Sequence, residues 1–312
     1  MRRSLAWNVI GVTVLVIVLM FTAGEVRFYS VNAGYTGEIL RKHSIFSKLE
    51  AEQISARISE VASGLGVLAR LQSEGIIAGD AETFSYLKSM LYMDKSADSV
   101  LLFDAGGAVV DAYPVQPGLS GIDMSNQEYY TGLAGQEGCR WSRAFMSPFT
   151  GHLTVTAALR MRSRIAVIFY NVDRMKDSII DIPSPHSTIM LVDRDGVVIT
   201  SSREGKDYAG MNIKNYGFVR SGLSGHEGTA FEPFDGEKGI VSVARIAGTE
   251  WLLTVFESEE DAFRSVRRSR NIAVAAMIAL SLLLIAALAA AYRLLLRPIR
   301  RLSEKTQLVA KG

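Results

Sequence analysis

The hydrophobic pattern of the chain contains two long apolar runs, one near each end. Residues 4–24 and 271–292 carry no charged side chain, whereas charged residues make up 21% of the chain as a whole. As helices rising about 1.5 Å per residue, both runs are long enough to cross a hydrocarbon layer of roughly 30 Å. We therefore predict transmembrane helices at residues 4–24 and 271–292, with one soluble segment at residues 25–270 between them.

Basic residues beside the two runs predict how the chain crosses the membrane. Arg2 and Arg3 precede the first run, and several Arg and Lys follow the second. Because cytoplasmic flanks are rich in these residues, we expect residues 1–3 and the C-terminal end in the cytoplasm. Residues 25–270 would then lie outside, in the periplasm or extracellular space of a two-pass protein of the cell (inner) membrane. Residues 4–24 also fit a cleaved signal peptide, and that alternative stays open.

A helical period follows the first apolar run. Ile54, Ile58, Val61, Leu65 and Leu68 are spaced alternately four and three residues apart, close to a heptad seam. This spacing predicts one long helix over residues 28–72, within a stalk at residues 25–75. The apolar seam has two interpretations that are compatible with each other: it packs on its own domain, or part of it pairs with a second copy in a homodimer.

Beyond the stalk the period changes to that of strands, and the pattern then repeats. Two predicted hairpins, at residues 99–112 and 188–200, share a turn in which Asp104 matches Asp193 and Gly107 matches Gly196. Three further matches follow in the same order: 132–138 with 222–228, 149–151 with 234–236, and 165–170 with 251–256. The chain therefore contains two copies of one α/β unit, the first repeat (residues 76–183) and the second repeat (residues 184–270), joined by a Pro-Ser-Pro linker.

These features resemble a known family. The Asp-x-x-Gly hairpin turn, the loop Asp123-Met-Ser-Asn-Gln-Glu-Tyr-Tyr130 and the long preceding helix are similar to the double Cache sensor domain of bacterial transmembrane receptors. The resemblance implies an α+β fold of two tandem PAS-like units, each an antiparallel sheet with flanking helices. It also implies that the first repeat is membrane-distal and the second repeat membrane-proximal.

The C-terminal residues carry a second resemblance. Residues 293–312 are similar to the start of a HAMP linker, with Ile299, Leu302, Thr306 and Val309 at the heptad positions of a parallel coiled coil. A basic helix lying on lipid is the alternative. A HAMP unit continues through a connector and a second helix, so we expect Gly312 to lie partway through such a relay.

The sequence offers no catalytic constellation. It lacks a phosphate-binding Gly-rich loop with Lys, a Gly-x-Ser-x-Gly elbow and a His-Glu-x-x-His motif. No two of its four histidines have ligand spacing, and the only cysteine is Cys139, so we expect no metal, no cofactor and no internal disulfide. The net charge of +2 gives no reason to expect a nucleic-acid partner.

The resemblance also implies a ligand site in the first repeat. In amino-acid-binding members, an Arg in the loop holds a carboxylate, aromatic residues form the wall and an Asp takes the amine. Gln127 stands at the Arg position, Tyr129 and Tyr130 at aromatic positions, Phe145 where a Tyr is usual, and Asp173 at the Asp position. Loss of the guanidinium and retention of the Asp favour a small cationic or uncharged polar ligand, such as an amine.

Each of these residues also has a plainer interpretation. The tyrosines and the neighbouring Trp141 are equally typical of a core, and Asp173 of a helix N-cap. Arg143 or Arg140 would restore carboxylate binding if its side chain pointed inward. The predicted ligand-binding residues are Gln127, Tyr129, Tyr130, Trp141, Arg143, Phe145 and Asp173.

The function we predict is that of a dimeric transmembrane receptor whose first repeat binds a small ligand outside the cell. The family most often relays such binding to a histidine kinase or a chemoreceptor module, and less often to a diguanylate cyclase. We favour the kinase. The alternative from another class is a membrane-anchored binding protein without an output module of its own.

Overall fold

The computed structural model describes residues 3–133, 138–179, 186–202 and 207–291. The predicted HAMP segment, residues 293–312, lies outside these residues. The helices are α1 (Arg3–Ser73), α2 (Asp80–Met93), α3 (Glu128–Thr131), α4 (Val172–Ile179), α5 (Gly217–Leu223), α6 (Glu259–Ala262) and α7 (Arg264–Ala291).

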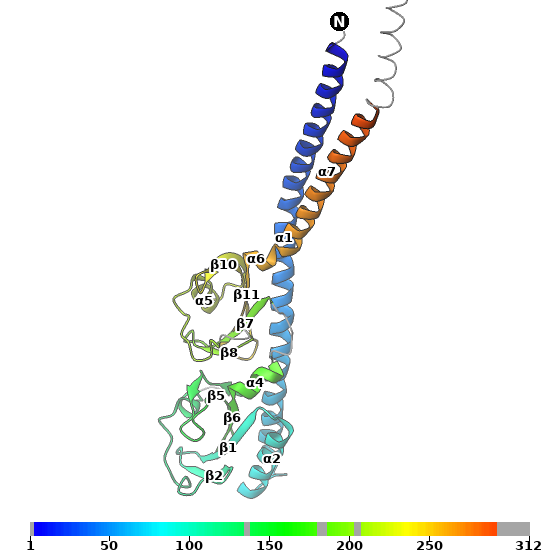
Figure 1. The fold of residues 1–312 in the computed structure, drawn as a ribbon. Helices are drawn as coiled ribbons and strands as arrows, with labels where there is room; N and C mark the ends of the chain where they lie inside the picture. The colour runs from blue at the N-terminus through cyan, green and yellow to red at the C-terminus, as the bar shows by residue number, and fades with distance from the viewer. Residues whose placement is uncertain (1–2, 134–137, 180–185, 203–206, 292–312) are drawn as a thin grey trace, which may run out of the picture. The chain divides into compact units, whose positions relative to one another are not determined.

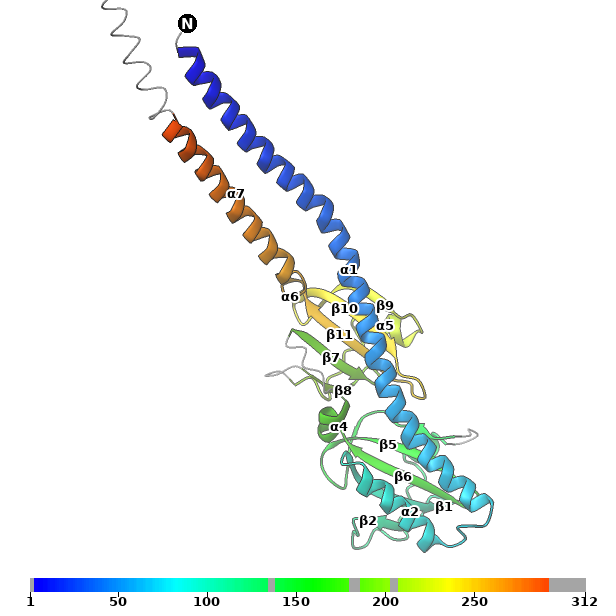
Figure 2. The same cartoon turned by 90° about the vertical axis from the view of Figure 1, so that its right-hand side faces the viewer.

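Two antiparallel sheets form the core, one in each repeat (Figures 1 and 2). The first has the order β2-β1-β6-β5-β3, with β4 also pairing with β5, and the second has the order β8-β7-β11-β10-β9. Sheets with flanking helices on a long N-terminal helix confirm the predicted fold class. The strands are β1 (Ala97–Asp104), β2 (Val109–Tyr113), β3 (Arg140–Trp141), β4 (Phe145–Met146), β5 (Leu153–Arg160), β6 (Arg164–Asn171), β7 (Ser187–Val192), β8 (Val198–Ser201), β9 (Gly228–Phe234), β10 (Glu237–Arg245) and β11 (Leu252–Ser258).

The two hairpins correspond in detail. A β-bulge interrupts the β1–β2 pairing just before Phe103, and a bulge interrupts the β7–β8 pairing at the equivalent position, just before Val192. Both turns need glycine, because Gly107 and Gly196 have φ values of 95° and 82° and a Cβ at either would lie 2.6 Å from a neighbouring side chain. The Asp-x-x-Gly repeat in the sequence therefore encodes one turn geometry used twice.

The inner strands of each sheet are buried on both faces, which explains their nearly continuous apolar sequences. In β1, Val100 and Leu102 face α1 whereas Leu101 and Phe103 face the opposite side, because successive side chains of a strand alternate. In β7, Leu191 likewise faces α1 and Val192 the opposite side. The α1 faces of both sheets belong to one hydrophobic cluster, and the two outer faces have a separate cluster each.

The apolar seam of α1 packs on its own chain. Ile54, Ile58, Leu65 and Leu68 are all buried in the cluster shared with the two sheets. Of the two interpretations of the heptad spacing, packing on the chain's own domain is therefore the one that accounts for these residues. The helix ends after Ser73, where the backbone turns through Gly75 at φ 74°.

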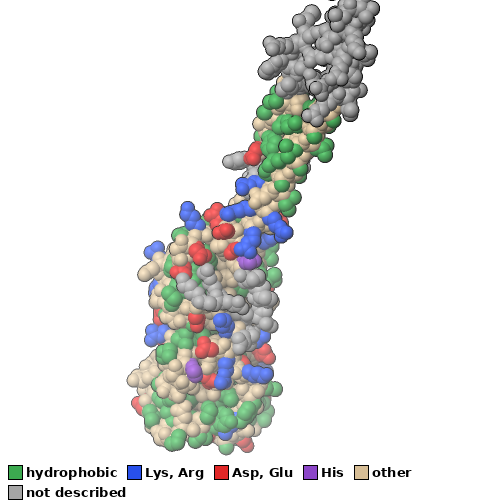
Figure 3. Space-filling model, in the orientation of Figure 1, with side chains coloured by type: hydrophobic (Ala, Val, Ile, Leu, Met, Phe, Trp, Pro, Cys, Tyr) green, Lys and Arg blue, Asp and Glu red, His purple; other side chains and the backbone are tan. Residues whose placement is uncertain are grey.

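The apolar runs at the ends of the chain lie in two helices. In the part of the chain that the structure describes, one helix is long and apolar enough to cross a membrane, Arg264–Ala290, within α7. A shorter apolar stretch, Gly11–Val26, lies in α1. Figure 3 shows apolar side chains covering this region, and many of them are exposed, among them Leu15, Leu19, Leu282 and Leu283.

The packing of α1 on the sheets is tested by two neighbouring residues. Leu68 is 0% exposed and Val67 is 48% exposed. We expect Leu68→Ala to lower the free energy of unfolding by about 3 kcal/mol, because it leaves a cavity in the shared core. Val67→Ala should change it by about 0.5 kcal/mol or less. Denaturant unfolding of the detergent-solubilised chain, followed by circular dichroism, measures both, and equal losses would contradict this packing.

Candidate functional site

Tyr129, in α3, lies at the centre of an aromatic cluster in the first repeat. Its side chain is buried. The centroid of its ring lies 5.4–6.2 Å from the ring centroids of Phe103, Phe145 and Phe169. Burial raises the pKa of its phenol to about 12, and its hydroxyl donates to the sulfur of Met124 at 3.3 Å. Two predicted site residues, Tyr129 and Phe145, are thus brought together inside a packed cluster.

Two further predicted residues lie at α3, one before the helix and one within it. Gln127 immediately precedes the helix and its side chain is exposed. Tyr130 is half-buried, its hydroxyl donates to the carbonyl of Ala105 at 2.6 Å, and the guanidinium of Arg160 lies 5.6 Å from its ring centroid. Tyr130 therefore fastens α3 to the hairpin turn of its own repeat.

The guanidinium of Arg143 is engaged in two ion pairs. It contacts Glu128 in the first repeat and Asp195 in the hairpin turn of the second, the latter at 3.2 Å. Its hydrogen bond to Asp195 and the charge of Glu128 raise the pKa of Arg143 further above its usual value. Arg143 thus joins the two repeats.

Asp173 lies apart from this group, in the first turn of α4, with its side chain exposed. The buried residue Asn171 caps this helix, because its Oδ1 accepts hydrogen bonds from the backbone N–H groups of Asp173 and Arg174. The N-cap role considered for Asp173 therefore belongs to Asn171.

Trp141 links the two repeats through aromatic contacts, edge-to-face with Trp251 and tilted with Tyr170. Its ring lies 5.1 Å from that of Tyr170 and 5.3 Å from that of Trp251, which belongs to the second repeat. The indole N–H of Trp251 donates to the carbonyl of Ser142 at 3.2 Å. The indole nitrogen of Trp141 is buried and has no hydrogen-bond partner among the residues that the structure describes.

A buried carboxylate completes the junction between the repeats. Asp193 closes its own hairpin turn by accepting backbone N–H groups of Asp195 and Val197 on Oδ1, and it accepts the N–H of Ala144 on Oδ2 at 2.9 Å. Burial raises the pKa of this carboxyl, opposed by the three N–H donors that lower it. The donor Ala144 lies between β3 and β4, where the edge of the first sheet is interrupted.

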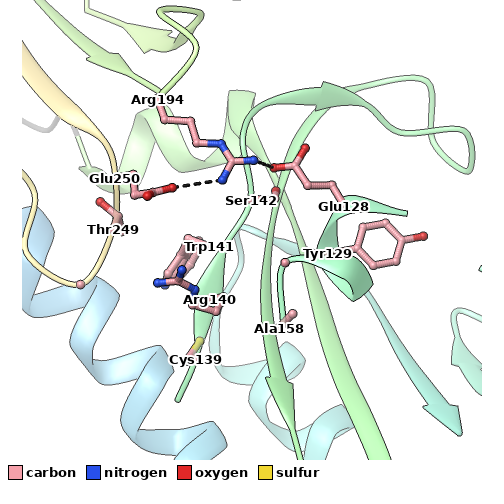
Figure 4. Close-up of a pocket in the computed structure, with 12 residues that line it drawn as sticks. Glu128, Tyr129, Cys139, Arg140, Trp141, Ser142, Ala158, Arg194, Thr249 and Glu250 are labelled. Atoms are coloured by element: carbon pink, nitrogen blue, oxygen red, sulfur yellow. Dashed lines mark hydrogen bonds and ion pairs between the residues drawn. The ribbon is translucent and has the colours of Figure 1, made fainter. Parts of the chain in front are cut away.

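A cavity of about 370 Å³ lies at this junction (Figure 4). Arg194 crosses it from the second repeat and binds Glu128 at 2.7 Å and Glu250 at 3.1 Å, as the dashed lines show. The first repeat lines the cavity with Glu128, Tyr129, Gly132, Cys139, Arg140, Trp141, Ser142 and Ala158, and the second repeat lines it with Arg194, Gly248, Thr249 and Glu250.

The comparisons with known proteins place this architecture in a family. A model described as a Cache domain matches residues 36–266, about three quarters of the chain. The chain belongs to the Cache domain family. No curated protein sequence matches it.

Solved structures share the Cache fold at low sequence identity. The ligand-binding domain of the Pseudomonas fluorescens chemoreceptor CtaA, in complex with L-isoleucine, is 14% identical with a TM-score of 0.60, covering 76% of this chain and 99% of that chain. The extracellular domain of the histidine kinase rpHK1S-Z16 is 15% identical with a TM-score of 0.58, covering 70% and 94%. The ligand-binding domain of the Pseudomonas aeruginosa PAO1 chemoreceptor PctB, with L-Gln, is 17% identical with a TM-score of 0.57, covering 76% and 97%. At these identities the likeness supports the fold alone.

Within this Cache domain the predicted site residues differ in how they lie relative to the junction cavity. Tyr129 and Trp141 line the junction cavity. Phe145 contacts the lining residue Tyr129, and Arg143 contacts the lining residue Glu128. Gln127 precedes α3 and Tyr130 lies within it, and neither they nor Asp173 line the cavity. The cavity residues Glu128, Arg194 and Glu250 were not predicted from the sequence. Glu128 lies in the loop 123–130 that carries the family resemblance, and Arg194 lies in the repeated Asp-x-x-Gly turn.

Among the residues described, no group of three or more His, Cys, Asp or Glu side chains has the geometry to hold a metal ion. The polar groups at the junction are instead arranged as salt bridges and backbone hydrogen bonds.

The role of Asp193 is tested against its counterpart in the first repeat. Asp104 accepts both N–H groups of its turn on Oδ1, so Asp104→Asn keeps these bonds. In Asp193 both carboxylate oxygens accept backbone N–H groups. Asp193→Asn replaces one of these oxygens by an NH2 group, which cannot accept, so at least one hydrogen bond is lost. We expect Asp193→Asn to lower the free energy of unfolding by about 2 kcal/mol, and Asp104→Asn by less than half of that.

Hydrogen exchange supplies a second readout. The amide of Ala144 should exchange faster in Asp193→Asn and at the wild-type rate in Asp104→Asn. Equal behaviour of the two variants would show that Asp193 holds only its own turn.

The thiol of Cys139 gives a pH-dependent test of the cavity wall. Burial raises the pKa of this thiol to about 12, against a hydrogen bond with the backbone of Ala158 that lowers it. Because the thiolate is the reactive form and a raised pKa keeps the thiol protonated, alkylation by iodoacetamide should be slow at neutral pH. The rate should still rise about tenfold per pH unit beyond pH 9, where an ordinary cysteine has levelled off. Intact-mass measurement follows this single cysteine, and a plateau near pH 8.5–9 would contradict burial.

Proposed function

We propose that this protein is a transmembrane receptor that senses a small polar molecule outside the cell. The observation that carries the proposal is the Cache domain at residues 36–266, which continues directly into a helix long and apolar enough to cross a membrane, Arg264–Ala290. A sensor domain at the membrane surface followed by a spanning helix is the arrangement that signalling across a bilayer needs.

The topology belongs to the same proposal. Residues 4–24 and 271–292 form two spans with both chain ends in the cytoplasm, so that residues 25–270 face the periplasm or the extracellular space of a cell (inner) membrane. The first span is supported by the apolar stretch Gly11–Val26 within α1. The second is supported by α7.

Dimerisation requires a face of α1 that the sheets leave uncovered. The seam at Ile54 and Ile58 is buried within the chain, whereas Ile45 and Leu49 are 51% and 52% exposed and lie one turn apart. We place the homodimer contact at Ile45 and Leu49, because exposed apolar side chains at this spacing form a helix-pairing stripe.

The ligand is proposed to bind in the first repeat, which we place farther from the membrane. Two Pseudomonas chemoreceptor domains of the same fold were solved in complex with L-isoleucine and L-Gln, which supports a ligand of similar size. The seven predicted residues around α3, β3, β4 and α4 stay the proposed site. Within it, the exposed carboxylate of Asp173 is proposed to pair with a ligand amine.

The output is proposed to be a cytoplasmic kinase or chemotaxis module reached through α7 and a HAMP relay. The extracellular domain of a histidine kinase and the domains of two chemoreceptors share the fold, which supports both modules. Coupling requires that ligand binding differ between two arrangements of the domain. The ion pairs of Arg143 and Arg194 between the repeats are the contacts that would change.

A thermal-shift screen of the full chain in nanodiscs tests the ligand class. We expect a small amine or amino acid to raise the unfolding temperature, and Asp173→Asn to abolish the shift given by the amine, because it removes the counter-charge. Glu74→Gln, which removes an exposed carboxylate near the end of α1, is the matched control. No shift by any amine, amino acid, amide or organic acid would overturn the sensor function. A shift that survives Asp173→Asn would overturn only the role of Asp173.

A further inference from the structure

We propose that the cavity between the two repeats binds a small monocarboxylate, with Arg140 as its anchor. This inference rests on the proposed function, in which the Cache domain binds a small extracellular molecule. It adds a second binding position, for a carboxylate, which lies at the junction of the repeats and does not include Asp173, where an amine is proposed to bind.

Arg140 can bind a ligand carboxylate, whereas the neighbouring arginines already have carboxylate partners. It lies on β3, held by the pairing of β3 with Ala158 of β5, and its half-buried side chain lines the cavity beside Trp141 (Figure 4). Arg143 and Arg194 are each paired with two carboxylates. Arg140 makes no ion pair with any residue that the structure describes. A guanidinium at a concave wall is built to hold a carboxylate through two parallel hydrogen bonds.

The charges of the lining select a single negative charge. Arg140 and Arg194 are balanced by Glu128 and Glu250, so the cavity is neutral before the ligand enters. A monoanion pairs with Arg140, whereas a phosphate or dicarboxylate would bring a second negative charge close to the two glutamates. An amine would meet carboxylates that Arg143 and Arg194 already hold. The arrangement therefore favours a monocarboxylate over a dianion or a simple amine.

The size and walls of the cavity suit a small organic acid. Its volume of about 370 Å³ is at the lower end of the roughly 300–1,000 Å³ typical of ligand pockets. Trp141 and Tyr129 border it with aromatic surface, against which the carbon skeleton of a ligand can pack.

Both repeats contribute to the cavity, so a ligand there would touch both. Arg140 and Trp141 come from the first repeat, whereas Thr249 and Glu250 come from the loop that precedes β11 in the second. Because a ligand shifts an equilibrium only through differential contacts, a molecule held on both sides favours the arrangement in which the two walls are close.

The test measures binding to the full chain in nanodiscs by calorimetry and by tryptophan fluorescence. The probes share one carbon skeleton: butyrate, butyramide and butylamine, with succinate and inorganic phosphate as dianions. We expect butyrate to bind at Arg140 and the other probes to bind there at least about tenfold more weakly. Arg140→Gln should raise the dissociation constant for butyrate at least tenfold, a change of about 1.4 kcal/mol, and Arg140→Lys by a smaller factor. Butyrate should also slow the alkylation of Cys139, which lines the same cavity.

The matched control is Arg162→Gln, which removes one positive charge from an exposed position outside the cavity lining. It should bind butyrate as the wild type does. The assignment is overturned if the wild type does not bind butyrate, if Arg140→Gln binds butyrate unchanged while folded, or if Arg162→Gln weakens binding equally. Tight binding of another ligand whose dissociation constant is unchanged by Arg140→Gln would overturn this site but not the proposed sensor function.

Discussion

A single hydrophobic core runs along α1 and includes residues from both sheets. Leu68 and Leu65 of the helix, Leu102 of the first sheet and Leu191 of the second are all fully buried in this cluster. Each sheet therefore has one face covered by the same helix, and neither repeat buries that face alone. At roughly 25 cal/mol per Å² of apolar surface removed from water, this shared burial dominates the stability of the domain. The geometry of the junction between the repeats depends on it, because α1 fixes the spacing at which their outer loops meet.

The junction arises from differences between two copies of one unit. Both hairpin turns are closed by an Asp and a Gly with the same hydrogen bonds, but only Asp193 uses its second carboxylate oxygen to hold the other repeat. In the first sheet the edge strand is divided into β3 and β4, whereas β9 of the second sheet is continuous. The break at Ser142–Ala144 turns backbone groups away from the sheet ladder, and these groups meet Asp193 and Trp251. A strand edge that would otherwise pair with another strand becomes a contact between the repeats.

The fold was predictable because its signals are local, whereas the site depends on contacts between distant residues. The turn at Asp104 and Gly107 and its copy at Asp193 and Gly196 are fixed by backbone geometry within a few residues, so the repeat is visible in the sequence. The heptad spacing at Ile54 and Ile58 predicted a helix but not its partner, because a buried stripe looks the same against a sheet or a second copy. Arg194 and Glu128 are 66 residues apart, and no local pattern indicates that they meet. The same limit applies to Arg140 and Arg143, whose different surroundings follow from where the second repeat packs.

The strengths of the junction contacts decide which of them a ligand can rearrange. The ion pairs of Arg143 and Arg194 involve half-exposed side chains, and such pairs contribute about 0–1 kcal/mol each in solvent. The hydrogen bond of Trp251 to Ser142 is buried, and that of Ala144 to Asp193 is partly buried with a fully buried acceptor. Losing either leaves a buried polar group without a partner, at a cost of about 1–3 kcal/mol. The ion pairs therefore rearrange at little cost around an entering molecule, while the buried bonds keep the repeats joined. A ligand in the cavity would then change the local packing of α3, β3 and the loop before β11 without separating the repeats, and β11 leads directly into α6 and α7.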